Sequence, residues 1–583
     1  MIFISILTLI VAKALPLINN HISPVYFTRI SALIFLYSSV LTFNMLYIQS
    51  IGSGLGIYSG LFQVTVISQF MELFIYLIGF LILIAWPLNF GGGSLRKGNL
   101  FNSESPDYCL IVLFSTLGSS LLVSSSDLVS MYLSIELQSF GLYVLATLYR
   151  DSESSTKAGL KYFLLGGLSS CFILLGSGLI YAFTGLTQFE SIYSLISTIF
   201  IGHCNLNEGG VVLGLISSEF SNIILGLSLG IILIIIGFLF KIAAAPLHNW
   251  SPDVYDETPT IVTIWLTIMP KIAILILLLE LLTQIGIIGS LNNVNLIGDS
   301  LDLIKFTNSQ TPTTYPLEEF GIEGLPNAFY IFKNILLISS LLSLIIGTVV
   351  GLAQTRLKRL FAYSTISHIG FMLLALAINS EQSIESFLFY IIQYSITNLD
   401  VFLIILALGY IIYPSLNSIR GEGKQEQDPL SIGKREVSYN LFKDISYISE
   451  LKGQFFLNPL LCLSLSICLF SMAGIPPLIG FFSKQFVLFS AIQSGYYFIA
   501  FVAIIVSVVS ASYYLKIIKV MLTNNDEENL SREAKTPLEL TSSVSNFHSF
   551  LISTLTLSIL LFISKSSLIL NSTQLLALSL FYS

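Results

Sequence analysis

The sequence predicts an all-α, polytopic membrane protein of about 14 transmembrane helices. Of its 583 residues, 54% are hydrophobic and only 10% are charged, and its mean hydropathy is +0.85. Soluble domains carry charges on about a quarter of their residues, so this composition excludes an ordinary water-soluble fold. A bilayer span needs about 20 apolar residues. The long apolar runs that cover most of the chain are therefore sufficient for many membrane crossings.

Hydropathy along the chain places the expected helices. The fourth apolar run is short, and the twelfth is interrupted by Pro476 and Pro477. Because proline has no backbone N–H and disrupts a helix, we expect the twelfth span to be broken. The expected spans are residues 1–18, 26–48, 62–86, 107–124, 127–149, 158–184, 222–247, 258–283, 328–352, 359–379, 384–413, 457–485, 495–521 and 550–572.

Loop charges test this count independently. If the N-terminus faces outside, the inner loops carry most of the basic residues and the outer loops are acidic, as the positive-inside rule requires. One missing or additional helix in the middle of the chain would destroy this pattern. The inner bases are Arg96, Lys97, Arg150, Arg356, Lys358, Arg420, Lys424, Lys434, Arg435, Lys443, Lys452, Arg532 and Lys535. The outer acids are Glu190, Glu208, Glu219, Asp299, Asp302, Glu318, Glu319 and Glu323, opposed mainly by Lys305.

Composition and motifs also limit what the chain binds. The net charge of −7 leaves no basic face for nucleic acid. The five cysteines, Cys109, Cys171, Cys204, Cys462 and Cys468, lack metal-ligand spacing, and we interpret them as small apolar fillers. No phosphate loop or haem motif occurs. The N-terminus runs directly into apolar sequence without an Arg-rich presequence, so the first helix is expected to remain in the mature protein.

Four ionisable residues lie within the expected spans. These are Glu136, Lys241, Lys271 and Lys484, each flanked by apolar residues over several turns. Placing a charge in the bilayer costs roughly 2.5–3.5 kcal/mol, so such residues are functional candidates. The alternative is a structural ion pair that joins two helices. That alternative explains a single residue better than it explains four residues on separate helices.

Desolvation suggests what this set does. Burial disfavours the charged form of both lysine and glutamate, so both groups are able to exchange protons near neutral pH. A carboxylate beside a lysine favours the charged pair, and separating the two releases the lysine proton. Moving one charge across the membrane costs about 2.3 kcal/mol per 100 mV. Transport therefore requires a driving force from outside this chain.

Further residues surround this set. Pro246 follows Lys241 by about one turn, and the Pro476-Pro477 pair precedes Lys484 by about two turns. Unwound backbone at membrane depth is tolerated only inside protein or beside water, and broken helices mark many ion sites, although a packing kink is the alternative. Secondary candidates, each with an ordinary structural alternative, are Lys161, His248 and His368 as relays, and Glu72 and Asp400, for which the sequence suggests no partner.

Five motifs follow one another between about residues 105 and 520. They are Lys157 to Gly185 with Lys161-Tyr-Phe-Leu-Leu-Gly; Phe238-Leu-Phe-Lys241 with Pro246-Leu-His248-Asn-Trp250-Ser-Pro252-Asp253-Val-Tyr255; Gln354 to His368; Ala473-Gly-Ile-Pro-Pro477 to Lys484; and Ser507 to Lys516. In this order they resemble the antiporter-like membrane subunits of respiratory complex I.

This resemblance implies two inverted five-helix repeats, spans 4–8 and 9–13, with broken helices at spans 7 and 12. It divides the chain into an N-terminal three-helix segment (1–104), a first repeat (105–283), an outer loop (284–327), a second repeat (328–521, with inner loop 414–456) and a C-terminal segment (522–583). By motif position, Glu136 and Lys241 resemble the family's switching pair, Lys271 its linking lysine and Lys484 its terminal group.

Within the family, the subunit 2 branch fits best. The subunit 4 branch typically has glutamate where this chain has Lys484, and the subunit 5 branch adds C-terminal helices for which little sequence remains after residue 572. The resemblance implies a proton-translocating subunit in the mitochondrial inner membrane, with the N-terminus on the intermembrane-space side. NADH, FMN, iron–sulfur clusters and ubiquinone are then expected in partner subunits, with no cofactor in this chain and with bound phospholipids.

Two alternatives belong to other classes. A multi-subunit cation/proton antiporter shares these motifs, and cofractionation with an NADH dehydrogenase separates it from the first interpretation. A purely structural membrane scaffold would tolerate neutralisation of its lysines. The partners expected from the leading interpretation are the neighbouring antiporter-like and small membrane subunits and the lipid bilayer.

Overall fold

The computed structural model describes residues 1–15, 24–48, 54–85, 107–149, 152–196, 216–284, 325–421, 444–523 and 545–582. Within them the chain is almost entirely helical, and ten helices are long and apolar enough to cross a membrane. These are α3 (Pro24–Met45), α4 (Val66–Ile84), α6 (Leu128–Ala146), α7 (Glu153–Thr184), α9 (Ile216–Ile242), α11 (Thr260–Gln284), α13 (Leu325–Leu352), α14 (Leu357–Ile378), α15 (Glu381–Gly421) and α19 (Tyr497–Leu522).

The other elements are shorter. They are α1 (Ile2–Ala14), β1 (Leu55–Ile57), β2 (Phe62–Val64), α5 (Asp107–Val123), α10 (Ser251–Glu257), the 3-10 turn η3 (Ile448–Leu451), α16 (Gln454–Leu457), α17 (Pro459–Ala473), α18 (Ile479–Gln493), α21 (Asn546–Leu560), the 3-10 turn η5 (Phe562–Lys565) and α22 (Ser567–Tyr582). Ten predicted spans are thus confirmed as membrane-length helices. The first, fourth, twelfth and last correspond to shorter helices, so their crossings stay a prediction.

In two predicted spans, local hydrogen bonds change the course of the backbone. The third was expected from residue 62, but residues 62–64 pair with β1 as an antiparallel hairpin. Helix α4 begins only after Thr65, whose side chain accepts a hydrogen bond from the amide of Ser68 in a capping box, a local signal to which hydropathy is blind. The last span was expected to be continuous over 550–572. It is broken between α21 and α22 at a serine-rich run, where the Ser564 hydroxyl donates to the Leu561 carbonyl.

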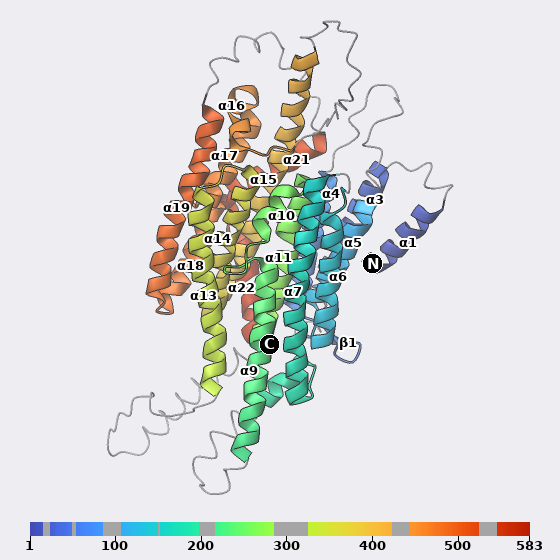
Figure 1. Ribbon diagram of the computed structural model, residues 1–583, viewed down its shortest axis with the longest axis vertical. Helices are drawn as coiled ribbons and strands as arrows, with labels where there is room; N and C mark the ends of the chain where they lie inside the picture. Colours follow the sequence, from blue (N-terminus) through green and yellow to red (C-terminus); the bar gives the residue numbers. More distant parts are fainter. Residues whose placement is uncertain are drawn as a thin grey trace.

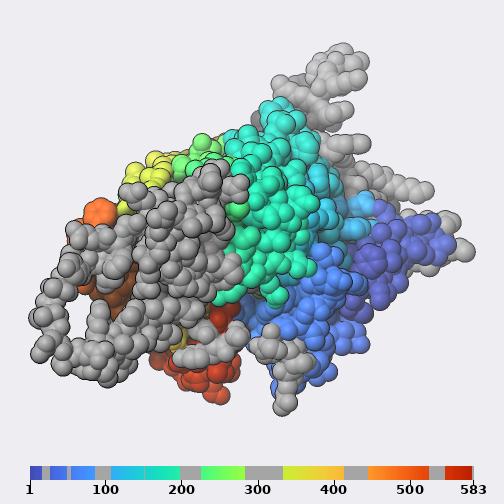
Figure 2. Space-filling model, turned by 90° about the horizontal axis from the view of Figure 1, so that it is seen from below, coloured from blue at the N-terminus to red at the C-terminus, as the bar shows by residue number. Residues whose placement is uncertain are grey.

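The helices run side by side along the long axis of the molecule (Figure 1), with α1 and α3 at one edge and α13 and α19 at the other. Viewed along that axis, the molecule is elongated from its blue N-terminal edge to its orange C-terminal part (Figure 2). Helices α21 and α22 pack against both α15 and α4. The C-terminal helices therefore connect the N-terminal segment with the second half of the bundle.

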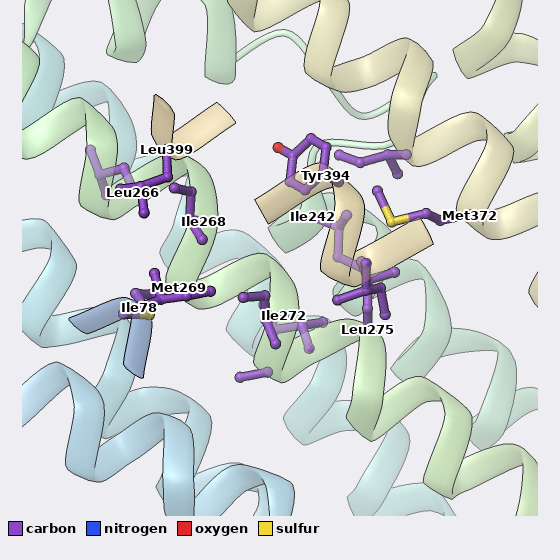
Figure 3. Close-up of a cluster of buried hydrophobic side chains, with 14 of the residues drawn as sticks. Ile78, Ile242, Leu266, Ile268, Met269, Ile272, Leu275, Met372, Tyr394 and Leu399 are labelled. Atoms are coloured by element: carbon purple, nitrogen blue, oxygen red, sulfur yellow. The ribbon is translucent and has the colours of Figure 1, made fainter. Parts of the chain in front are cut away.

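The centre of the bundle is formed by α11, α14 and α15. All but one of the residues of α14 are buried, whereas only a third of the membrane-spanning part of α7 or α19 is buried. Around α11, apolar side chains from α4, α9, α14 and α15 meet (Figure 3). Helix α11 carries Lys271, so this lysine lies at the centre of the protein.

Two helices are interrupted where the sequence predicted breaks. Helix α9 ends at Ile242, Ala243 has a positive φ of 65°, and the chain passes Pro246 before α10 begins. Helix α17 ends at Ala473, Gly474 has a φ of 87°, and α18 restarts at Ile479. Left-handed backbone suits glycine because it has no Cβ. Both breaks lie beside a predicted lysine.

Only a few of the predicted loop charges lie within the described residues. At one end, which we call the α10 end, α10 contacts the start of α7 and the start of α14, and Arg356 and Lys358 lie there. Glu190 follows the opposite end of α7, where its carboxylate lies 3.4 Å from the amide nitrogen of Gln63. Asp256 and Asp444 pair with Arg356 and Lys358 at the α10 end, so the described charges leave the predicted asymmetry a prediction. Most other loop charges, including those of 285–324 and 422–443, lie outside the described residues.

Candidate functional site

Glu136 and Lys241 form a buried ion pair. The Lys241 ammonium lies 3.1 Å from a Glu136 carboxylate oxygen, and the two side chains are 7% and 15% exposed. Helix α6 supplies Glu136, and Lys241 ends the first part of the broken span. The hydroxyl of Ser170 on α7 also donates to Glu136, and the Lys241 ammonium donates to Ser139 at 2.8 Å. Both charged groups thus have polar support from neighbouring helices.

A small cavity of about 10 Å³ lies beside this pair. A volume of roughly 10–15 Å³ is about what one water molecule needs. Lys241, Ser139 and Tyr143 contribute polar atoms to its wall, and Pro270, which precedes Lys271, closes it on the α11 side. The cavity therefore lies between Lys241 and the part of α11 that adjoins Lys271.

Lys271 is 2% exposed and, within the described chain, has no carboxylate in ion-pair range. Its ammonium donates to the Thr365 hydroxyl at 3.0 Å and to the Tyr394 hydroxyl at 3.4 Å. The rings of Tyr255 and Tyr394 lie 5.3 and 5.9 Å from the same nitrogen. Aromatic faces and hydroxyls stabilise a buried ammonium only partly, so this lysine sits in an environment that tolerates both the charged and the neutral form.

Lys484 lies beside the second break. Its ammonium donates to the carbonyls of Met472 and Ala473 at 2.9 and 3.0 Å, which are among the carbonyls left free at the end of α17. The C-terminal end of a helix carries partial negative charge and favours a cation. The stem of Lys484 packs on Gly474, where a Cβ would come within 3.1 Å of the lysine Cδ. The broken helix therefore builds the lysine site.

His368 lies between the two central lysines. Its Nδ1 is 2.8 Å from the Tyr390 hydroxyl and its Nε2 is 3.3 Å from the Tyr514 hydroxyl. The Tyr394 ring lies 6.0 Å from the His368 ring and 5.9 Å from the Lys271 nitrogen. The Phe371 ring, three residues after His368, lies 5.8 Å from the Lys484 nitrogen. The predicted relay position of His368 is thus compatible with its surroundings, because it is hydrogen-bonded on both nitrogens and close to both lysines.

The structure does not bring Lys161 and His248 into any of the three buried-lysine sites. Lys161 is 39% exposed and forms an ion pair with Asp253 of α10, which Arg359 of α14 also contacts at 2.8 Å. The His248 ring lies against Tyr363, with ring centres 6.3 Å apart. Both residues belong to the α10 end. There Asp253 joins α7, α10 and α14.

A second ionic cluster pins the start of α11 at this end. Asp444 accepts hydrogen bonds at 2.8 Å from the backbone amide and the hydroxyl of Thr260, and its carboxylate lies 2.5 Å from the Lys358 ammonium. Burial alone would raise the pKa of Asp444, but the charge of Lys358 and the hydrogen bonds from Lys358 and Thr260 lower it below its usual value. Asp444 is therefore ionised at neutral pH.

Sequence reasoning missed one buried acid and left another without a partner. Glu280 on α11 is 4% exposed, and its charge interacts with that of Glu72 on α4; a glutamate inside Ile-Leu-Ile-Leu-Leu-Leu-Glu-Leu-Leu was the available signal. Asp400, for which no partner was predicted, accepts a hydrogen bond from the Cys468 thiol at 3.1 Å. The described part of the chain contains no cluster of metal-ligating side chains, and Cys204 lies outside it.

The fold and the buried charges together define a class. Membrane-length helices surround a series of ionisable side chains that no soluble core would need, and two helices are interrupted beside them. Intramembrane charges and broken helices are features of proteins that move ions across membranes. The protein is therefore an ion-translocating type of helical membrane protein.

The chain belongs to the NADH:quinone oxidoreductase/Mrp antiporter transmembrane family, whose pattern matches residues 125–297, 325–425 and 430–510. It is 46% identical over 607 aligned residues to NADH-ubiquinone oxidoreductase chain 2 of Rhizopus oryzae, covering 100% of both chains. Its fold resembles a chain of respiratory complex I from Thermus thermophilus, with a TM-score of 0.59, 24% identity, and coverage of 96% of this chain and 98% of that one. It also resembles a chain of the Mrp complex from Dietzia sp., with a TM-score of 0.67, 15% identity, and coverage of 100% and 96%.

Proposed function

We propose that this chain is a core membrane subunit, of the chain 2 type, of NADH:ubiquinone oxidoreductase, and that it carries protons for that enzyme. The similarity to chain 2 of Rhizopus oryzae extends over the whole length of both chains. The observation that carries the proton role is the buried Glu136–Lys241 pair, with its atoms 3.1 Å apart. Flavin, iron–sulfur clusters, NADH and quinone would be bound by partner subunits.

The pair acts through its separation. While Glu136 is close, its negative charge keeps the proton on Lys241. Moving the two apart leaves a lysine in a low-dielectric interior, where the charged form is costly. Lys241 then releases its proton toward the cavity bordered by Pro270. One proton leaves one amine, and the energy for the separation comes from partner subunits.

The proton continues through the centre of the bundle. Lys271 accepts it, and the hydroxyls of Thr365 and Tyr394 hold the resulting ammonium. His368 lies on the way to Lys484, from which the proton leaves. Water molecules would complete the gaps, because Lys271 and Lys484 do not contact each other. Moving each charge against a potential of 100 mV requires about 2.3 kcal/mol.

The finer topology belongs to the same proposal. It comprises fourteen spans, two inverted repeats over 105–283 and 328–521, and the segments 1–104, 284–327 and 522–583. The two repeats would account for the two interrupted helices at corresponding positions. The α10 end, to whose loops the sequence assigns most of the basic residues, would face the mitochondrial matrix by the positive-inside rule. This orientation puts the N-terminus on the intermembrane-space side of the inner membrane. Phospholipids would cover the exposed faces of α7 and α19.

A Lys241→Met variant, assayed in native membranes, tests the proposal. We expect the complex to assemble, while NADH:quinone turnover and proton pumping fall together. Lys157→Met is the matched control, because Lys157 lies on α7 with a 66% exposed side chain paired to Glu153. Unchanged turnover and pumping in Lys241→Met would exclude the proposed role. Failure of the chain to cofractionate with an NADH dehydrogenase would favour the antiporter alternative that the family also contains.

A further inference from the structure

Asp400 is an acid in the interior of the bundle that the proposed route does not use. It lies in the membrane-spanning part of α15, Glu381–Ile412, in which an apolar stretch of 18 residues is 94% buried. Asp400 itself is 0% exposed. An ionisable side chain at such a place is costly and is rarely kept without a role. Its surroundings therefore need an explanation.

The contacts of Asp400 are those of a neutral acid. Its Oδ2 accepts a hydrogen bond from the Cys468 thiol at 3.1 Å, and a thiol is a weak donor. Its Oδ1 is buried and has no hydrogen-bond partner among the described residues. No lysine, arginine or histidine of the described chain lies in ion-pair range of it. An isolated carboxylate in a low-dielectric interior is unfavourable, and a carboxyl group that keeps its proton avoids that cost.

A line of polar side chains leads from Asp400 toward Lys484. Ser483, the neighbour of Lys484, donates to the Gln393 side chain at 3.3 Å, and Gln393 donates to the Thr397 hydroxyl at 3.3 Å. Thr397 precedes Asp400 by three residues, so the two lie on the same face of α15. These side chains provide hydrogen-bonding groups for water along an otherwise apolar helix.

Asp400 also lies on the α10 side of Lys484. The carbonyl that binds the Lys484 ammonium belongs to Met472, and the thiol that binds Asp400 belongs to Cys468, one turn earlier on α17. Helix α17 starts near the α10 end, because the amide of Ile448 just before it is bonded to the Thr355 carbonyl at the start of α14. Asp400 is therefore nearer the α10 end than the lysine.

We propose that Asp400 exchanges protons with Lys484 and reloads it from the α10 end in each cycle, after the proton that reached Lys484 past His368 has left. This inference rests on the proposed function, since it assigns the entry side of one of its lysines. The Asp400 carboxyl transfers its proton through water to the neutral Lys484 amine, and the resulting carboxylate takes a new proton from the α10 end. No other atom or electron moves. Cys468 and the Thr397–Gln393–Ser483 line hold the acid and the water in place.

The test compares three substitutions in the intact complex. Asp400→Asn and Asp400→Ser keep a small polar side chain but carry no exchangeable acid, whereas Asp400→Glu restores one. We expect Asn and Ser to lower pumping and NADH:quinone turnover by at least about tenfold, as loss of a proton-transfer group does, and Glu to recover most of both. Cys462→Ala, which removes another buried thiol of α17 that does not bind Asp400, is the matched control and should remain close to the unmodified protein.

The outcomes separate this inference from the proposed function. Full pumping in an assembled Asn or Ser variant would overturn the role of Asp400, while Lys241→Met still reports on the proposed function independently. If neither Asn nor Ser assembles but Glu assembles with full activity, the acid is structural, and the inference is wrong. Normal pumping in Lys241→Met and Lys484→Met would instead remove the proposed function itself.

Discussion

A double-substitution cycle on Glu136 and Lys241 distinguishes a proton-transfer pair from an ion pair that only joins two helices. The three variants are Glu136→Gln, Lys241→Met and the combination of both. In the unmodified protein the charged atoms are 3.1 Å apart, and both side chains are largely buried. Each single substitution therefore leaves one charge in the membrane without its counter-ion.

The structure sets the size of the effect. Breaking a fully buried pair costs roughly 3–5 kcal/mol, but each survivor here keeps a neutral partner: Ser139 for Lys241 and Ser170 for Glu136. The survivor can also become neutral by losing or gaining a proton. We therefore expect about 2 kcal/mol of lost stability for each single variant and about 1 kcal/mol for the double variant, a coupling energy of about 3 kcal/mol.

The assay follows the fraction of intact complex after graded denaturation, together with pumping in resealed membranes. Both single variants should lose stability, and the double variant should recover much of it, whereas pumping should be absent in all three. Recovery of pumping in the double variant would show that the pair is only structural. Additive losses of stability would show that the two charges do not interact, which contradicts the observed geometry.

Three further predictions concern neighbouring groups. Asp444→Asn should speed hydrogen exchange at the Thr260 amide about 10- to 100-fold at neutral pH, the equivalent of about 1.4–2.8 kcal/mol. Because the pKa of Asp444 is lowered in the folded protein, its stabilisation is complete above the unfolded value of about 4 and is lost as the pH falls through the lowered value; protection in the unmodified protein should decline there. Lys271→Met should abolish pumping without loss of assembly, as judged on native gels, because no carboxylate of the described chain loses a partner. Gly474→Ala should lower stability by about 1–2 kcal/mol through strain at its φ of 87° and reduce pumping by moving Lys484, whereas Gly178→Ala, with nothing within 4 Å of the new Cβ, should change neither.

Hydropathy was sufficient to locate ten membrane-length helices, because length and apolar composition alone determine whether a helix can cross a bilayer. It failed where local hydrogen bonds decide the backbone, as at Thr65 before α4 and at the serines after Leu560. The buried lysines were predictable from the cost of their charges. The pairing of Glu136 with Lys241 was implied only by the family resemblance, because the two residues are 105 positions apart in sequence and no local pattern links them.

The same reasoning explains why Asp253 was placed only by the structure. The sequence identified Lys161 as a relay candidate, but its ion pair to Asp253 depends on α10 folding back onto the starts of α7 and α14. Glu280 was missed for a different reason. It stands in an apolar run where one acid changes the hydropathy little, although its burial makes it as costly as the residues that were identified.

The two broken helices place their lysines in different electrostatic settings, and this difference assigns them different parts in a cycle. Lys241 has a carboxylate at 3.1 Å, so its proton is held until the pair is separated. Lys484 is held by the carbonyls of Met472 and Ala473, which are dipoles without net charge, so its proton is released without separating any ion pair. A controlling signal is therefore effective at Lys241, whereas Lys484 follows the protonation of its surroundings. This order requires that Glu136→Gln weaken the control of proton release more than any substitution of the carbonyl-bearing residues around Lys484.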